Sequence, residues 1–66
     1  MWAVVHIAPN RAVADMIKEV LEKEGLLVMV RPLDIPHMGA SGSYEVLVPE
    51  GEAPQAQEIL AQIIGE

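Results

Sequence analysis

The residues best suited to chemistry lie together in one short segment. The stretch DIPHMGASG, residues 34–42, holds a histidine, an aspartate and a serine, and Ser43 follows it directly. A hydrolytic site needs a nucleophile beside a base that a third group orients. Serines flanked by glycines in a loop lack that rigid support, so the segment predicts recognition or a plain connection rather than catalysis.

The same segment belongs to a connection that is longer than a hairpin turn needs. Residues 32–43 join two segments predicted to be strands, whereas hairpin loops commonly hold about 2–5 residues. Prolines stiffen this connection, and glycines allow it to turn. It is predicted to be either a partner-binding loop or a simple connector, and the side chains that would contact a partner are Asp34, His37, Met38 and Ser41.

Neither a metal site nor a cofactor site is predicted. The chain has two histidines, His6 and His37. Together with Asp34 and Glu45 they supply metal-ligand groups, but no two of these residues have the short spacing of a metal motif. Arg11 stands where free N–H groups at a helix start can hold an anion. No glycine-rich phosphate loop accompanies it, so a phosphate site is not predicted.

Length and charge narrow the classes of function. At 66 residues the chain is expected to form one domain, residues 1–66, near the lower size limit for folding alone. It has no cysteine, so disulfides and thiolate zinc sites are excluded. Oligomerisation is therefore the expected way to stabilise such a small core. Its 10 acidic and 4 basic residues give a net charge of −6, which argues against binding to nucleic acid or to anionic membrane surfaces.

No segment is expected to cross a membrane. The longest apolar stretch, LLVMV, is far shorter than the ~20 residues that a span needs. The beginning, MWAVVHIAP, has neither a basic start nor a small-residue cleavage site, so it is not expected to be a signal peptide. A cytoplasmic location is therefore expected.

Two amphipathic helices are predicted from apolar residues spaced i, i+3, i+4, i+7 and i+8. The first covers residues 11–24, with Asn10 as its N-cap and Gly25 after its end. The second covers residues 53–64, with Pro54 in its first turn. Their apolar stripes are predicted to lie in the core: Val13, Met16, Ile17, Val20 and Leu21 in the first helix, and Ala56, Ile59, Leu60, Ile63 and Ile64 in the second.

Three short segments rich in β-branched residues, 2–7, 26–31 and 44–48, are predicted to be strands. Right-handed crossovers and helices that cover a sheet face favour a three-stranded sheet in the order 1-3-2, with both helices on one face. Strands 1 and 3 are expected to run parallel, and strands 2 and 3 antiparallel. The predicted fold class is α+β, a ferredoxin-like βαββα sandwich without its last strand.

Alternation along the strands predicts which side chains face the helices. The inward set is Ala3, Val5, Ile7, Val28, Val30, Tyr44, Val46 and Val48. The outward set is Trp2, Val4, His6, Leu27, Met29, Arg31, Glu45 and Leu47. Five of these eight outward residues are apolar, whereas a half-solvated sheet shows polar residues there. A homodimer is therefore expected, either through this face, with the interface residues Trp2, Val4, His6, Leu27, Met29 and Leu47, or through the open edge of the first strand.

Three stretches carry a family resemblance: a strand ending in APN, a helix beginning RAVADMIKEVLEKEG, and the run YEVLVPEGEAPQAQEIL. Together they resemble a family of small bacterial proteins described as prokaryotic signal-transducing proteins, a domain of unknown function. The resemblance covers nearly the whole chain, and its most specific parts are APN and VLVPE. It implies a fold similar to that of PII-type nitrogen-signalling proteins, in which the connection corresponding to PLDIPHMGASGS binds partners. Nucleotide binding is not carried over, because PII-type proteins use several basic side chains and this chain has four.

Two classes of function follow. The favoured one is a small homo-oligomeric signalling or interaction domain that binds a protein or a small metabolite through residues 32–43 or the sheet face. The alternative is a small enzyme or accessory subunit with a site formed between subunits, although no catalytic constellation is visible. Similar short chains are sometimes labelled glutamate decarboxylase, an enzyme that needs a buried Schiff-base lysine for pyridoxal phosphate. Lys18 and Lys23 lie on the solvated face of their predicted helix, so that label is not supported.

Overall fold

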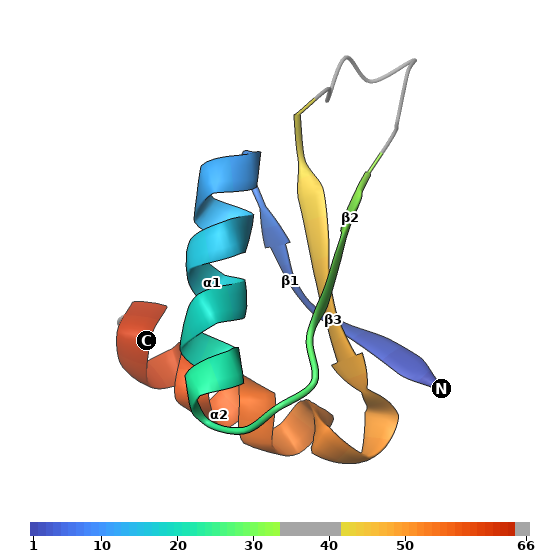
Figure 1. Cartoon of the computed structure of the whole chain (residues 1–66), viewed down its shortest axis with the longest axis vertical. Coiled ribbons are helices and arrows are strands. Elements are labelled where there is room, and N and C mark those ends of the chain that lie inside the picture. The colour runs from blue at the N-terminus through green and yellow to red at the C-terminus, as the bar shows by residue number, and fades with distance from the viewer. Residues whose placement is uncertain (34–41, 65–66) are drawn as a thin grey trace.

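The computed structural model describes residues 1–33 and 42–64, which follow the order β-α-β-β-α (Figure 1). The strands are β1 (Trp2–Ala8), β2 (Met29–Pro32) and β3 (Tyr44–Pro49). The helices are α1 (Arg11–Lys23) and α2 (Ala53–Ile64), and the 3-10 turn η2 (Glu50–Glu52) leads into α2. The predicted bounds of both helices are confirmed to within one residue, and β2 begins three residues later than expected. No helix within these ranges has the length and apolar character needed to span a membrane.

The central strand of the sheet is β3, which pairs antiparallel with both neighbours in the order β1-β3-β2. The predicted order and the small α+β, ferredoxin-like class are confirmed. The expectation that strands 1 and 3 run parallel is wrong. Because α1 returns the chain between β1 and β2, these two strands run in the same direction without pairing. The chain then reverses from β2 into β3, which enters between them and is therefore antiparallel to both.

Both ends of α1 are built as the sequence predicts. The side chain of Asn10 accepts a hydrogen bond of 2.9 Å from a backbone N–H of the first turn. At the other end Gly25 has φ +88°, and its N–H donates to the carbonyl of Glu22. The N–H of Leu26 donates to the carbonyl of Leu21 at 3.2 Å. These two bonds form a Schellman motif, which turns the chain so that Leu26 joins Leu21 in the core.

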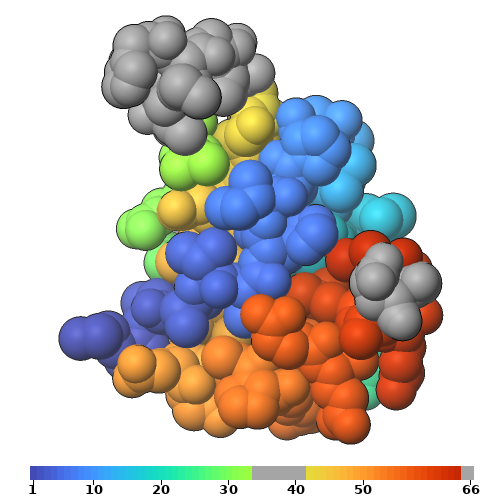
Figure 2. Space-filling view, turned by 180° about the vertical axis from the view of Figure 1, so that it is seen from behind, coloured from blue at the N-terminus to red at the C-terminus, as the bar shows by residue number. Residues whose placement is uncertain are grey.

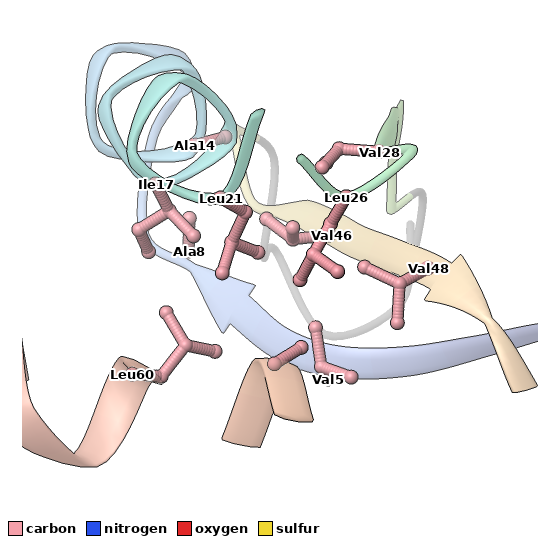
Figure 3. Packing of buried hydrophobic residues seen from close by; sticks show 11 residues of the cluster. Val5, Ala8, Ala14, Ile17, Leu21, Leu26, Val28, Val46, Val48 and Leu60 are labelled. Atoms are coloured by element: carbon pink, nitrogen blue, oxygen red, sulfur yellow. The ribbon is translucent and has the colours of Figure 1, made fainter. Parts of the chain in front are cut away.

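The core fills the space between the two helices and one face of the sheet (Figure 3). Its buried residues are Val5, Ala8, Ala14, Ile17, Leu21, Leu26, Val28, Val46, Val48, Ala56 and Leu60. Figure 3 shows Leu21 of α1 near Val46 of β3, and Leu60 of α2 reaches the same cluster from the other helix. Because both helices contribute to one cluster, they cover the same face of the sheet, as predicted.

The prediction that the helix stripes lie entirely in the core is wrong at three positions. Met16, Ile63 and Ile64 are 55%, 47% and 45% exposed. Figure 1 shows the reason, because α2 crosses the C-terminal end of α1 instead of lying beside it along the sheet. Each helix therefore buries only those residues of its apolar stripe that contact the other helix or the sheet.

Candidate functional site

A β-bulge in β1 decides which of its side chains face outward. Val4 lies opposite Leu47, but the next paired residue of β1 is His6, which lies opposite Val46. Val5 therefore has no counterpart in β3. A bulge inserts one extra residue into a strand, so every later side chain changes face relative to strict alternation.

Because of the bulge, His6 and Ile7 each lie on the side of the sheet that was predicted for the other. His6 lies opposite Val46, a core residue, and is therefore on the helix side of the sheet. Ile7 lies opposite Glu45 on the other side. The predictions that His6 belongs to the outer face and that Ile7 faces the core are both wrong. Ile7 is the outward apolar residue that sequence reasoning missed.

Pairing and alternation together define the outer sheet face, the side turned away from the helices. It consists of Trp2, Val4, Ile7, Met29, Arg31, Glu45, Leu47 and Pro49. Every member except Arg31 and Glu45 is apolar. Leu47, at the centre between Val4 and Met29, is 2% exposed, whereas Trp2 and Val4 are 42% and 44% exposed. Figure 2 shows β1 at the surface of the molecule, and both helices contribute to the core on the opposite side of the sheet.

The two charged residues of the outer sheet face neutralise each other. Arg31 of β2 and Glu45 of β3 lie directly opposite in the ladder. The Arg31 Nε donates to Oε1 of Glu45 at 2.8 Å, and the side chains are 57% and 16% exposed. The face therefore carries no net charge, in a chain whose net charge is −6.

A second apolar surface lies on the helix side, where His6 meets both helices. A groove of about 330 Å³ lies there, with Met16 and Val20 of α1 on one side and Ile63 and Ile64 of α2 on the other. Met16, Ile63 and Ile64, the three stripe residues that the crossing of the helices leaves exposed, all line this groove. Because His6 and Glu45 lie on opposite sides of the sheet, they cannot share a metal ion.

The structure brings together most of the predicted interface. Trp2, Val4, Met29 and Leu47 share the outer sheet face, whereas His6 lies on the other side of the sheet. Leu27 is 63% exposed but precedes the first residue of β2, so the pairing does not place it on this face. The predicted partner-loop residues, Asp34, His37, Met38 and Ser41, lie outside the described residues. Within the described parts of the chain, no three His, Asp or Glu side chains gather as a metal site.

Comparisons with models of protein families, with curated proteins and with solved structures find no match for the chain. The similarity to prokaryotic signal-transducing proteins stays a prediction that rests on motifs such as APN and VLVPE.

Proposed function

We propose that this protein is a small interaction domain that works as a homodimer, with the outer sheet faces of two copies packed against each other. The observation that carries the proposal is the outer sheet face itself, which is apolar apart from one internal ion pair and leaves Trp2, Val4 and Ile7 more than 40% exposed. Contiguous exposed apolar patches commonly mark interfaces. Two sheets can pack face to face at a separation of about 10 Å.

The charges favour a second copy of the chain as the occupant of this face. The Arg31 and Glu45 charges cancel within each copy. The face therefore offers no field that would select a charged partner, and it meets its own copy without opposing like charges. Burying it adds about 25 cal/mol for each Å² of apolar surface. A chain of 66 residues without disulfides has a small core, and such chains gain most from a second apolar layer.

The bulge in β1 favours packing through the face over pairing through the edge. A strand edge pairs well when its free N–H and C=O groups repeat regularly, and bulges interrupt that repeat. Here the extra residue, Val5, stands in the middle of Trp2–Ala8. Two β1 edges would therefore meet with only short regular stretches on either side of the bulge.

Such a dimer suits the signalling role that the family resemblance implies. Packing through the outer sheet face leaves the helix side of each copy accessible to a protein or a small metabolite. The domain would then act by binding rather than by chemistry, with two equivalent surfaces for its partners.

Fluorescence of Trp2 tests the proposal, because it is the single tryptophan of the chain and lies on the outer sheet face. On concentration from the nanomolar to the micromolar range, we expect the emission to shift to shorter wavelength as the indole leaves water. Sedimentation should show the mass doubling over the same range. A mass that stays monomeric throughout would contradict the proposal.

Two matched variants identify the surface that is used. Val4→Glu places a charge in the outer sheet face and keeps the reporter, and it should weaken the dimer at least about tenfold, as losses at buried interface centres do. Met16→Glu makes the same change on an exposed apolar residue of the helix-side groove and should leave the dimer intact. Dissociation by Met16→Glu but not by Val4→Glu would assign association to the groove instead.

A further inference from the structure

A pocket between α1 and the β2 edge of the sheet is a candidate small-molecule site. Its volume of about 370 Å³ lies at the low end of the ~300–1,000 Å³ usual for such sites. Figure 1 shows that α1 begins at the same end of the molecule where β2 ends and β3 begins. The lining residues that bear on its chemistry are Arg11, Asp15, Lys18, Val28, Val30 and Tyr44.

The pocket gathers positive charge in an acidic protein. Arg11 and Lys18 are two of only four basic residues in a chain of net charge −6. They stand seven residues apart on α1, two turns along one side of the helix. With one carboxylate, Asp15, also in the lining, the ionised side chains sum to one positive charge. This sum matches a ligand that carries a single negative charge.

Within residues 1–33 and 42–64, no short ion pair occupies the donors of either cation. The Nε of Arg11 is 3.7 Å from Oδ2 of Asp15, and the two side chains are 74% and 58% exposed. An ion pair this long and this exposed contributes little, so the guanidinium keeps donors for another partner. Lys18 is half-buried and forms no ion pair with any residue of the described ranges.

The uncharged residues that line the pocket are Val28, Met29, Val30, Pro32 and Tyr44. Val28 is buried in the core cluster, and Val30 and Tyr44 pack against that cluster from the sheet. Their surfaces toward the pocket can contact a hydrocarbon chain or ring. A binding site of this kind combines an apolar floor with a few polar groups that fix the orientation of the ligand.

We propose that this pocket binds a small organic monocarboxylate. Arg11 and Lys18 hold the carboxylate, and the hydrocarbon part of the ligand packs on Val28 and Tyr44. The planar fork of a guanidinium matches a carboxylate in two parallel hydrogen bonds. A nucleotide or a doubly charged phosphate brings more negative charge than the site balances beside Asp15. The inference does not depend on the proposed dimer, because a monomer contains the whole pocket.

Nuclear magnetic resonance titration of the full chain tests the inference, with 4-methylpentanoate as the probe. We expect saturable shifts of the backbone amides of Val28, Val30 and Tyr44. The uncharged 4-methylpentanamide tests the need for the carboxylate, and inorganic phosphate tests the need for the hydrocarbon. Saturable binding of the carboxylate alone supports the proposal. Equal binding of the amide, equal binding of phosphate, or no saturation by the carboxylate overturns it.

A matched pair of lysine variants confirms the location. Lys18→Gln should raise the dissociation constant of 4-methylpentanoate about tenfold, since a hydrogen bond to a charged group commonly contributes that much. Lys23→Gln makes the same change in the last turn of α1, where the side chain does not line the pocket, and should leave the constant unchanged. The same spectra show whether each variant is folded. Equal effects of the two variants would contradict the proposed site.

Discussion

Arg31 and Glu45 lie directly opposite each other on β2 and β3, and their side chains form a 2.8 Å ion pair within an otherwise apolar face. Glu45 is the more buried partner, at 16% exposed. A carboxylate with so little access to water depends on its donor, because burying a charge without a partner is costly. By donating to Glu45, Arg31 allows the central strand to carry a carboxylate within an apolar surface.

Removing the cation of this pair should destabilise the fold. We expect Arg31→Ala to lower the free energy of unfolding by about 1 kcal/mol, because the Glu45 carboxylate loses its hydrogen-bond donor. Urea denaturation at a fixed protein concentration measures this loss. Arg11→Ala is the control, since its pair with Asp15 is long and exposed, and it should change stability by less than about 0.5 kcal/mol. Equal losses of unfolding free energy in the two variants would show that the Arg31–Glu45 pair stabilises the fold no more than the exposed Arg11–Asp15 pair does.

Replacing both partners of this pair by apolar residues should strengthen the dimer. The double variant Arg31→Met, Glu45→Leu removes both charges together, a change that is often neutral or stabilising for a largely buried pair. It also makes the outer sheet face wholly apolar. We expect the dimer to tighten at unchanged or higher stability, as measured by sedimentation and urea denaturation. Weaker association of the double variant would contradict a dimer formed through this face.

The C-terminal turn of α1 offers a test of backbone conformation alone. Gly25 has φ +88°, and a Cβ added there would meet no atom within 4 Å. We expect Gly25→Ala to cost about 1 kcal/mol from backbone strain without any clash. In a domain of this size, that loss lowers the melting temperature by about 4–8 °C. Gly51→Ala is the matched control, because its site is equally open and lacks a positive φ. Equal melting temperatures for the two variants would contradict the assignment.

The helix ends could be predicted because their signals are local. Asn10 caps the first turn and Gly25 supplies the left-handed residue, and both act on neighbours a few positions away. The antiparallel pairing of β1 and β3 also follows from the order of the elements. A helix joins β1 to β2, so these strands run in the same direction, and the chain reverses before β3. The exposure of Met16 could not be predicted, because it depends on the way α2 crosses α1.

The bulge in β1 is the feature of the candidate site that could not be predicted from the sequence. WAVVHIA contains no glycine or proline to mark an interruption, and its alternation is ambiguous because nearly every residue is apolar. Only the pairing with β3 shows that Val5 is the extra residue and that Ile7, not His6, turns outward. The predicted sides of β1 were therefore correct up to Val5 and exchanged at His6 and Ile7.

The bulge makes a specific prediction about two adjacent residues. Ile7→Glu should weaken the dimer, because it places a second carboxylate next to Glu45 on the outer sheet face. His6→Glu should leave the dimer constant nearly unchanged, because that side chain lies on the helix side. Sedimentation of the two variants gives the comparison. If His6→Glu were the variant that dissociates the dimer, the position of the bulge or the choice of face would be wrong.

The most direct measurement of the central claim is an isotope-filtered nuclear Overhauser experiment on a mixture of labelled and unlabelled copies. It detects only contacts between two chains. We predict contacts between the indole of Trp2 in one copy and the methyl groups of Val4, Ile7 or Leu47 in the other, with none at Ile63 or Ile64. Contacts between chains at Ile63 and Ile64, or between the backbones of two β1 strands, would contradict association through the outer sheet face.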